Sequence, residues 1–100
     1  MELQNRVALI TGGKRIGAAI AIDLARRGMD VALSYNRSRR EAEEAADAIR
    51  GAGRRCAVIQ ADLSQARECA RLVNDAVTSL GRLDVLINMA SVSAVPSRGS

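Results

Sequence analysis

The stretch RVALITGGKRIG, residues 6–17, decides the fold. It begins with an uninterrupted apolar run, residues 7–10, and continues into glycines at positions 12, 13 and 17. Short apolar runs of this kind are typical of strands that are buried on both faces, as in parallel sheets. The stretch therefore predicts a strand, a tight glycine turn and the start of a helix.

The same alternation of strand and helix patterns continues to residue 88. Further strands are predicted at residues 30–35, 55–60 and 83–88, and helices at residues 14–27, 38–51 and 64–80. Strands that alternate with helices are the signature of βαβ units and a parallel sheet. Right-handed crossovers give the strand order 3-2-1-4, so we expect an α/β, Rossmann-type fold with flanking helices, an incomplete doubly wound sheet.

The first helix is predicted to turn one apolar stripe toward the sheet. The members of this stripe recur at helical spacing: Ile16, Ala19, Ile20 and Leu24.

Single residues predict where the helices begin and end. Ser38 and Glu41 have the spacing of a capping box at the second helix, and Ser64 is expected to cap the third. Gly28 and Gly81 follow the first and third helices, where a left-handed residue commonly ends a helix.

The charge pattern favours one small anionic ligand over nucleic acid. The chain carries a formal charge of +4, but its arginines are scattered among acidic residues and only 1% of its residues are aromatic. Bases therefore have almost nothing to stack on. Only two basic groups stand out, namely Lys14-Arg15 and Arg37 with Arg39-Arg40.

The cysteines and the N-terminus point to an ordinary reducing compartment. Cys56 and Cys69 lie thirteen positions apart in a chain without histidine, a spacing that matches no familiar zinc site. We expect two free thiols and no metal. The sequence shows neither a secretory leader nor an apolar stretch that could span a bilayer, so a cytoplasmic location without a membrane partner is the default expectation.

The glycine turn is placed where a dinucleotide would need close approach to the backbone. Gly12 opens the turn, and the helix that starts at Lys14 offers unpaired N–H groups and the positive end of its dipole to a pyrophosphate. The alternative is a tight turn with no ligand.

The end of the second strand predicts which dinucleotide binds. NAD-binding domains usually carry an Asp or Glu there, which holds the ribose hydroxyls and would repel a 2′-phosphate. This chain has Tyr35-Asn36-Arg37-Ser38 instead, and Arg37 can grip a phosphate together with Lys14 and Arg15 of the glycine turn. The sequence thus favours NADP, and the alternative is a set of solvated arginines beside a helix start.

The ends of the third and fourth strands add further candidates. Asp62 could read an adenine amino group at the rim of the crevice, or it could be a loop acid that supports the next helix; spacing leaves both open. Asn88 offers a side-chain amide that can tie neighbouring strands, which favours a structural role over a catalytic one. The small residues Ala90 and Ser91 would let the cofactor ribose pass.

Taken together, these motifs resemble the short-chain dehydrogenase/reductase family, and within it the pteridine-reductase-like branch. The resemblance covers about residues 5–97 and rests on Lys14-Arg15-Ile16-Gly17, Tyr35-Asn36-Arg37-Ser38, Asp62-Leu63 and Asn88-Met89-Ala90-Ser91. It implies a Rossmann fold and NADP-dependent hydride transfer to a carbonyl or pterin-like substrate.

The resemblance also implies roles for individual residues. Arg15 and Ile16 would face the cofactor, while Asn36, Arg37 and Ser38 would hold the 2′-phosphate. Asp62-Leu63 matches the adenine-contacting pair of the family. The cofactor-binding set predicted in this way comprises Gly12, Lys14, Arg15, Ile16, Asn36, Arg37, Ser38, Asp62, Leu63, Asn88, Ala90 and Ser91.

Three departures from the family pattern bear on activity. The glycine turn is one residue shorter, and Met89 replaces an asparagine. The catalytic serine and the Tyr-x-x-x-Lys pair belong after the fourth and fifth strands of the family, whereas the only tyrosine here, Tyr35, is followed four positions later by Arg39. No catalytic residue is therefore assigned, and the chain alone is expected to be inactive.

The expected organisation is residues 1–90 as the N-terminal half of an NAD(P)-binding domain, with residues 91–100 as a loop or tail. Two alternatives to a fragment of a reductase stay open. One is a non-catalytic NADP-binding module, and the other is a remnant that does not fold stably alone. Homo-oligomers are expected only for a full-length form.

Overall fold

A computed structural model describes residues 2–12 and 14–89 of the chain, without the side chains of Lys14 and Arg15. Its strands are β1 (Val7–Thr11), β2 (Asp30–Tyr35), β3 (Cys56–Gln60) and β4 (Val85–Asn88). Its helices are α1 (Lys14–Arg26), α2 (Arg39–Gly51) and α3 (Ala66–Leu80). All strand pairs are parallel and the sheet order is β3-β2-β1-β4, which confirms the predicted α/β fold.

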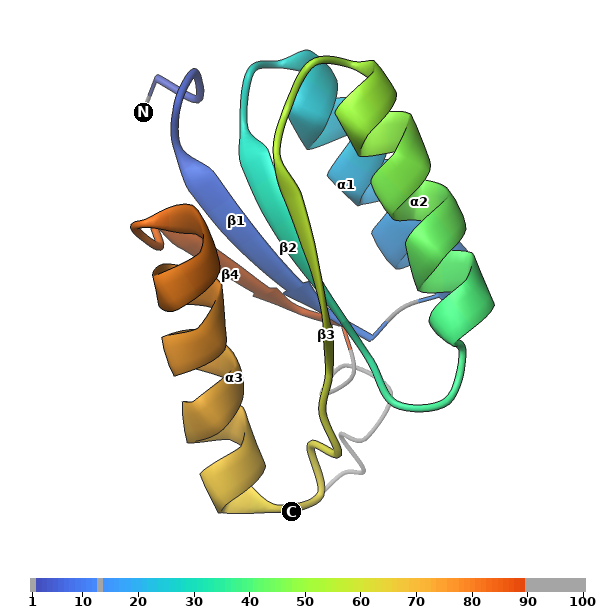
Figure 1. The fold of residues 1–100 in the computed structure, drawn as a ribbon, viewed down its shortest axis with the longest axis vertical. Coiled ribbons are helices and arrows are strands. Elements are labelled where there is room, and N and C mark those ends of the chain that lie inside the picture. The colour runs from blue at the N-terminus through green and yellow to red at the C-terminus, as the bar shows by residue number, and fades with distance from the viewer. Residues whose placement is uncertain (1, 13, 90–100) are drawn as a thin grey trace, which may run out of the picture.

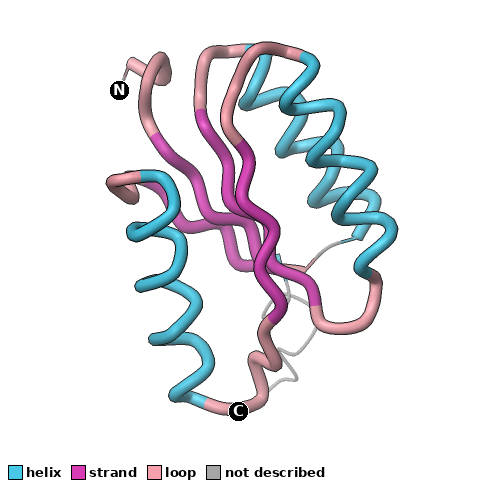
Figure 2. The backbone as a smooth tube through the Cα atoms, in the orientation of Figure 1, coloured by secondary structure: helices cyan, strands magenta, loops and turns pink. Residues whose placement is uncertain are grey.

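The sheet is the middle of three layers. Helices α1 and α2 lie side by side on one face, and α3 covers the other face (Figure 1). The strands fan out between these layers, as the tube in Figure 2 shows. The helices that follow β1 and β2 thus share one face, and the crossover after β3 moves the chain to the opposite face.

Strand β1 supplies both halves of the core. Leu9 and Ile10 are fully buried neighbours whose side chains point to opposite faces of the sheet, as the pleat of a strand requires. Ile10 packs in the cluster beneath α1 and α2, and Leu9 packs in the cluster beneath α3. An uninterrupted apolar run is therefore what this central strand needs.

The small residues of α1, rather than the predicted apolar stripe, pack closest to the sheet. Gly17, Ala21 and Ala25 are buried, whereas Ile16 is 64% exposed and Ala19 is exposed as well. The predicted stripe is wrong in these two members. Small side chains let the helix backbone approach the strands closely, and this displaces the packing face by one position around the helix.

The helix starts differ from the predicted caps. Ser38 is the N-cap of α2, but within the described residues its side chain makes no capping hydrogen bond, because its φ of −95° and ψ of 57° lie outside the extended conformation that a cap adopts. The N-cap of α3 is Gln65, not Ser64. The Ser64 hydroxyl donates instead to Oδ1 of Asp62 at 2.8 Å. Local hydrogen bonds of this kind compete with caps.

The predicted helix ends are confirmed. Gly28 and Gly81 have φ values of 98° and 88°, in the left-handed region that favours glycine.

Two arginines cover the outer edge of β3. The Arg55 carbonyl accepts a hydrogen bond from β2, so the carbonyls of Cys56 and Gln60 point outward from the sheet. The guanidinium of Arg50 donates to the Cys56 oxygen at 2.9 Å, and that of Arg71 donates to the Gln60 oxygen at 2.7 Å. Charged side chains in these positions hinder further strand pairing at this edge.

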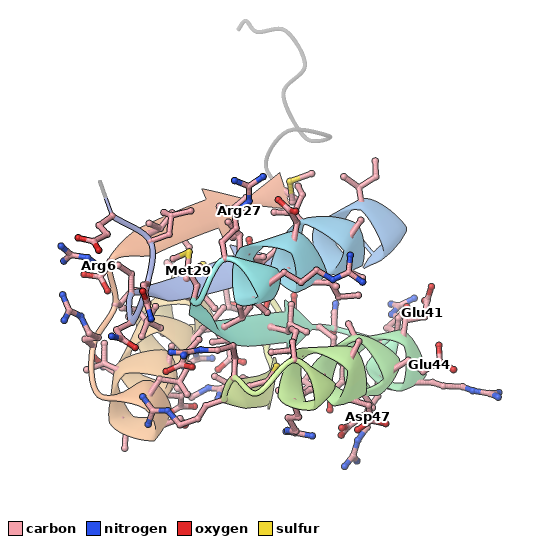
Figure 3. All side chains as sticks on the ribbon, turned by 90° about the horizontal axis from the view of Figure 1, so that it is seen from above. Arg6, Arg27, Met29, Glu41, Glu44 and Asp47 are labelled. Carbon is pink, nitrogen blue, oxygen red and sulfur yellow. The ribbon has the colours of Figure 1, made fainter. Side chains whose placement is uncertain are left out.

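Most other charges are solvated. Glu41, Glu44 and Asp47 project from the outer side of α2, away from the sheet (Figure 3). The exception is Asp30, whose buried carboxylate at the start of β2 binds both Arg54 and Arg55.

The described part of the chain contains two free cysteines, Cys56 buried and Cys69 exposed, as predicted. Within residues 2–12 and 14–89, no group of His, Cys, Asp or Glu could hold a metal ion. No helix in these ranges has the length and apolar character needed to cross a membrane.

Candidate functional site

The carboxyl ends of the four strands meet along one rim of the sheet. At its centre Thr11 of β1 lies in register with Ser34 of β2 and with Asn88 of β4. Helix α1, which follows β1, and helix α3, which precedes β4, lie on opposite faces of the sheet, which makes this the switch point where open parallel sheets bind ligands. The Thr11 hydroxyl donates to Oδ1 of Asn88 at 2.8 Å, so the Asn88 side chain ties β1 to β4, the structural role that its position suggested.

The glycine turn after β1 is built for close backbone contact. Gly12 has a φ of 67°. A Cβ atom added to Gly17 would lie 2.6 Å from the Gly12 carbonyl oxygen, so the first turn of α1 packs directly on the turn. This cradle accepts glycine only, and it leaves the N-terminus of α1 at the rim of the sheet. Such a helix end favours an anionic group.

Three of the predicted residues of the glycine turn carry side chains, namely Lys14, Arg15 and Ile16. The structure describes only the side chain of Ile16. Its 64% exposure at the first turn of α1 is unusual for an isoleucine. The backbones of Lys14 and Arg15 form the start of α1, whereas their side chains lie outside the described residues.

The loop between β2 and α2 holds the next three predicted residues, of which Asn36 and Arg37 are exposed and Ser38 is half-buried. The backbone turns here directly after Tyr35, whose carbonyl accepts from the N–H of Ala61 at 2.9 Å. This hydrogen bond holds the ends of β2 and β3 side by side. The loop after β2 therefore lies next to the residues that follow β3.

The two neighbouring arginines of the predicted basic group do not join this loop. Arg39 pairs with Glu43 at 3.5 Å and Arg40 pairs with Glu44 at 3.7 Å, both along α2. Both arginines thus have acidic partners on their own helix. The i,i+4 spacing of a helix offers them nearer partners.

Asp62 is held by the loop that follows β3. Its Oδ1 accepts from the Ser64 hydroxyl at 2.8 Å and from the Ser64 N–H at 3.1 Å. These hydrogen bonds, together with the positive charge of Arg37, hold the pKa of the Asp62 carboxyl below its usual value. Asp62 thus supports the loop, which is one of its two predicted roles. The charge of Arg37 also acts on its carboxyl. An adenine contact stays a prediction.

The remaining predicted residues have mixed outcomes. Leu63 is half-buried and packs against the cluster under α3. Ala90 and Ser91 lie outside the described residues. Asn88 is the last residue of β4, and every other predicted residue whose position is described lies in one of the segments that follow β1, β2 and β3.

Sequence reasoning missed two residues of this rim. Gly17 was part of the quoted motif, and only the 2.6 Å approach to Gly12 shows that it is obligatory. Gln60, the last residue of β3, contacts the β2–α2 loop: its Nε2 lies 3.4 Å from both the backbone oxygen and Oδ1 of Asn36. No sequence pattern signals that pair, because Gln60 ends β3 while Asn36 lies in the loop after β2.

Comparison with known proteins agrees with this geometry. The chain matches the family described as short chain dehydrogenase over residues 6–99. It is 44% identical to a hydroxynaphthalene reductase of Aspergillus fumigatus over 88% of the chain, and covers 33% of that protein. It is 40% identical to the short-chain dehydrogenase/reductase homolog YusS of Bacillus subtilis over 93% of the chain, and covers 86% of that protein.

Solved structures show the same fold. A protein from Burkholderia cenocepacia described as a dehydrogenase, with bound NADP, is 42% identical with a TM-score of 0.82; the match covers 87% of this chain and 34% of that one. An NADH-dependent reductase solved with NAD is 38% identical with a TM-score of 0.77, over 86% of this chain and 36% of that one.

The chain thus spans about a third of the length of the Aspergillus and Burkholderia proteins. The names of these relatives leave the pteridine-reductase-like branch as a prediction. The family match extends over nearly the whole chain, and the parallel sheet has the strand order that the family structures share. This chain therefore belongs to the short chain dehydrogenase family of oxidoreductases.

Proposed function

We propose that the chain binds the adenosine end of NADP and belongs to a reductase that transfers a hydride to a carbonyl or pterin-like substrate. The observation that carries the choice of NADP is the end of β2. It reads Tyr35-Asn36-Arg37-Ser38, with an amide, a guanidinium and a hydroxyl where a carboxylate would hold the ribose of NAD.

The electrostatics of the rim support this proposal. Hydrogen bonds from Ser64 are the main cause of the lowered pKa of the Asp62 carboxyl, and the positive charge of Arg37 contributes in the same direction. Arg39 and Arg40 are paired along α2, which concentrates the proposed phosphate contact on Arg37. Hydrogen bonds to a charged phosphate are worth about 1.5–3 kcal/mol each, enough for tenfold discrimination or more.

The glycine turn fits the pyrophosphate of the same cofactor. A close approach that excludes a Cβ at Gly17, a positive φ at Gly12 and the N-terminus of α1 together offer backbone N–H groups to an anion. The exposed Ile16 would cover an apolar part of the ligand. The proposed cofactor set is Gly12, Lys14, Arg15, Ile16, Asn36, Arg37, Ser38, Asp62, Leu63, Asn88, Ala90 and Ser91.

The residues of this chain supply binding and orientation. NADPH, when bound, supplies the hydride, and the reaction also needs a residue that gives a proton to the substrate. Tyr35 does not have a lysine four residues after it and lies at the adenosine end of the rim. We therefore propose residues 1–90 as a cofactor-binding unit and residues 91–100 as a tail, and we assign no proton donor among them.

A binding module without turnover is the second candidate. It would use the same cofactor-binding residues and would need binding without turnover. Both candidates require NADP binding, and only assays with added carbonyl or pterin substrates separate them.

The direct test is cofactor binding by the purified 100-residue chain. Thermal unfolding is followed with NADPH and with NADH at matched concentrations, since a ligand that binds only the folded state raises the midpoint. We expect a larger rise with NADPH. Equal shifts would refute the 2′-phosphate assignment, and no shift with either cofactor would refute binding altogether.

A further inference from the structure

The side chain of Gln60 links the end of β3 to the loop that follows β2. Gln60 lies in register with Tyr35, the last residue of β2. Its Nε2 atom is 3.4 Å from the backbone oxygen of Asn36 and 3.4 Å from Oδ1 of the same residue. The NH₂ group of Gln60 has two N–H donors and thus serves two acceptors.

The backbone oxygen decides how both amides are oriented. A carbonyl only accepts hydrogen bonds, so the end of Gln60 that approaches it is the NH₂ group. An NH₂ group only donates, so the Asn36 atom on the same NH₂ is Oδ1. The NH₂ group of Asn36, with its two donors, therefore points away from Gln60.

The backbone of Gln60 is held from α3 without help from its side chain. Nη2 of Arg71 donates to the Gln60 oxygen at 2.7 Å. The same guanidinium binds Glu68 at 2.9 Å and Asp75 at 2.8 Å. A change in the Gln60 side chain therefore leaves the end of β3 anchored.

We propose that Gln60 is a positioning residue for cofactor choice, which keeps Asn36 turned so that its NH₂ group faces the 2′-phosphate. This rests on the proposed function, in which the phosphate binds at residues 36–38. An amide can present either a donor or an acceptor to a ligand, and only the donor attracts a phosphate. Gln60 sets the orientation of the Asn36 amide before the cofactor binds.

Two variants separate the effect of the hydrogen bonds from the effect of side-chain size. Gln60→Met keeps a similar length and removes both contacts, and we expect NADPH to bind about threefold to tenfold more weakly, the value of one ordinary hydrogen bond. Gln60→Glu places an acceptor against the Asn36 carbonyl, so Asn36 turns its NH₂ group inward. We expect a loss of tenfold or more for NADPH and less than twofold for NADH.

A matched control tests whether an added negative charge alone changes the cofactor preference. Gln4→Glu makes the same substitution beside Gly28, before the amino end of the strands, and should leave the ratio of the NADPH and NADH dissociation constants unchanged. Each ratio is measured on one variant, so a change in stability common to both cofactors cancels.

A double variant tests whether Gln60 acts through Asn36. Asn36→Ala alone should lower NADPH affinity, and adding Gln60→Met should lower it no further. Independent losses would overturn the proposal.

A readout without cofactor keeps this test separate from the proposed function. In the free chain, Gln60→Met should shift the NMR signals of the Asn36 side-chain amide, which Asn36→Ala identifies by their loss. Unchanged signals would overturn the orientation.

The two proposals fail in distinguishable ways. If the natural chain prefers NADPH through Arg37 while Gln60→Met and Gln60→Glu keep the ratio within twofold, the role of Gln60 alone is refuted. If the natural chain shows no preference for NADPH, both are refuted.

Discussion

The Thr11 hydroxyl donates a 2.8 Å hydrogen bond to Oδ1 of Asn88, and the two residues are also partners in register on β1 and β4. Thr11 is 3% exposed, so its hydroxyl has little access to water and depends on this acceptor. The bond ties the carboxyl ends of β1 and β4 together at the rim that the cofactor is proposed to cross.

We expect this bond to appear as a coupling energy in a double-mutant cycle. Thr11→Val and Asn88→Ala should each lower the free energy of unfolding, and together they should cost about 0.5–1.5 kcal/mol less than the sum of the two. Urea unfolding of the four proteins measures this. Strictly additive losses would show that the bond contributes nothing to stability.

Arg37→Asp should reverse the cofactor preference. The substitution removes the proposed phosphate contact and places a carboxylate where NAD-binding domains have one, so NADPH should bind at least about tenfold more weakly while NADH changes little or improves. Titration with both cofactors checks this.

Arg40→Asp is the matched control for Arg37→Asp. It makes the same change of charge at a residue that is 92% exposed and pairs with Glu44 along α2. A similar loss of NADPH in both variants would mean that the general charge of the surface, and not the Arg37 contact, sets the affinity.

The pH dependence of stability should involve Asp30. Burial raises the pKa of its carboxyl, but hydrogen bonds from the Arg55 N–H and guanidinium, with the charges of Arg54 and Arg55, outweigh burial and leave the pKa below 3.8. A lowered folded pKa contributes stability above the unfolded value, and this contribution is lost as the pH falls through the folded value. Asp30→Asn should therefore cost about 2 kcal/mol at pH 7, since it breaks a buried pair, and the cost should shrink below about pH 4.

Asp23→Asn provides the control for this effect. Its ion pair with Arg27 at 3.0 Å is exposed, with 59% and 61% of the two side chains open to water. Exposed pairs contribute about 0–1 kcal/mol. Urea unfolding at several pH values compares the variants, and a constant difference between Asp30→Asn and the natural chain from pH 3 to pH 7 would contradict the assignment.

Gly17→Ala should disrupt the glycine turn. The added methyl would meet the Gly12 oxygen at 2.6 Å, so either the turn or α1 must move, at a cost of about 1–3 kcal/mol. We expect both NADPH and NADH to bind more weakly and to equal degrees, because the pyrophosphate is common to them.

Gly51→Ala is the comparison for that variant. A Cβ at Gly51, the last residue of α2, meets no atom of the described chain within 4 Å. Thermal unfolding and cofactor titration should match the natural chain or show a slight gain in stability from the better helix former. A harmless Gly17→Ala would show that the turn does not need the close approach.

The sequence predicted the architecture because strands and helices leave local patterns. The apolar run of residues 7–10 and the alanine-rich helix near residue 45 specify a buried strand and a helix face wherever they lie in the fold. With the handedness of crossovers, this determines the strand order 3-2-1-4. Gly28 and Gly81 could be assigned as helix ends because a positive φ is a property of single residues.

Ser38 is the N-cap of α2 as predicted but without the expected side-chain hydrogen bond, and the predicted cap at Ser64 is wrong. The Ser64 hydroxyl is bound to Asp62 instead, and the backbone at Ser38 is turned away from capping geometry. The face of α1 that packs on the sheet also differs from the predicted one. Close packing on the sheet selects Gly17, and a hydrophobicity pattern gives more weight to the larger Ile16.

By itself, the sequence of this protein determined its elements, their order in the sheet, its family motifs and the absence of an acid after β2, since all of these depend on neighbours along the chain. Only the tertiary structure decided that Gln60 lies against Asn36 and that Thr11 meets Asn88. Such contacts depend on distances between separate strands and on which partner a side chain can reach first. No local pattern encodes either of these.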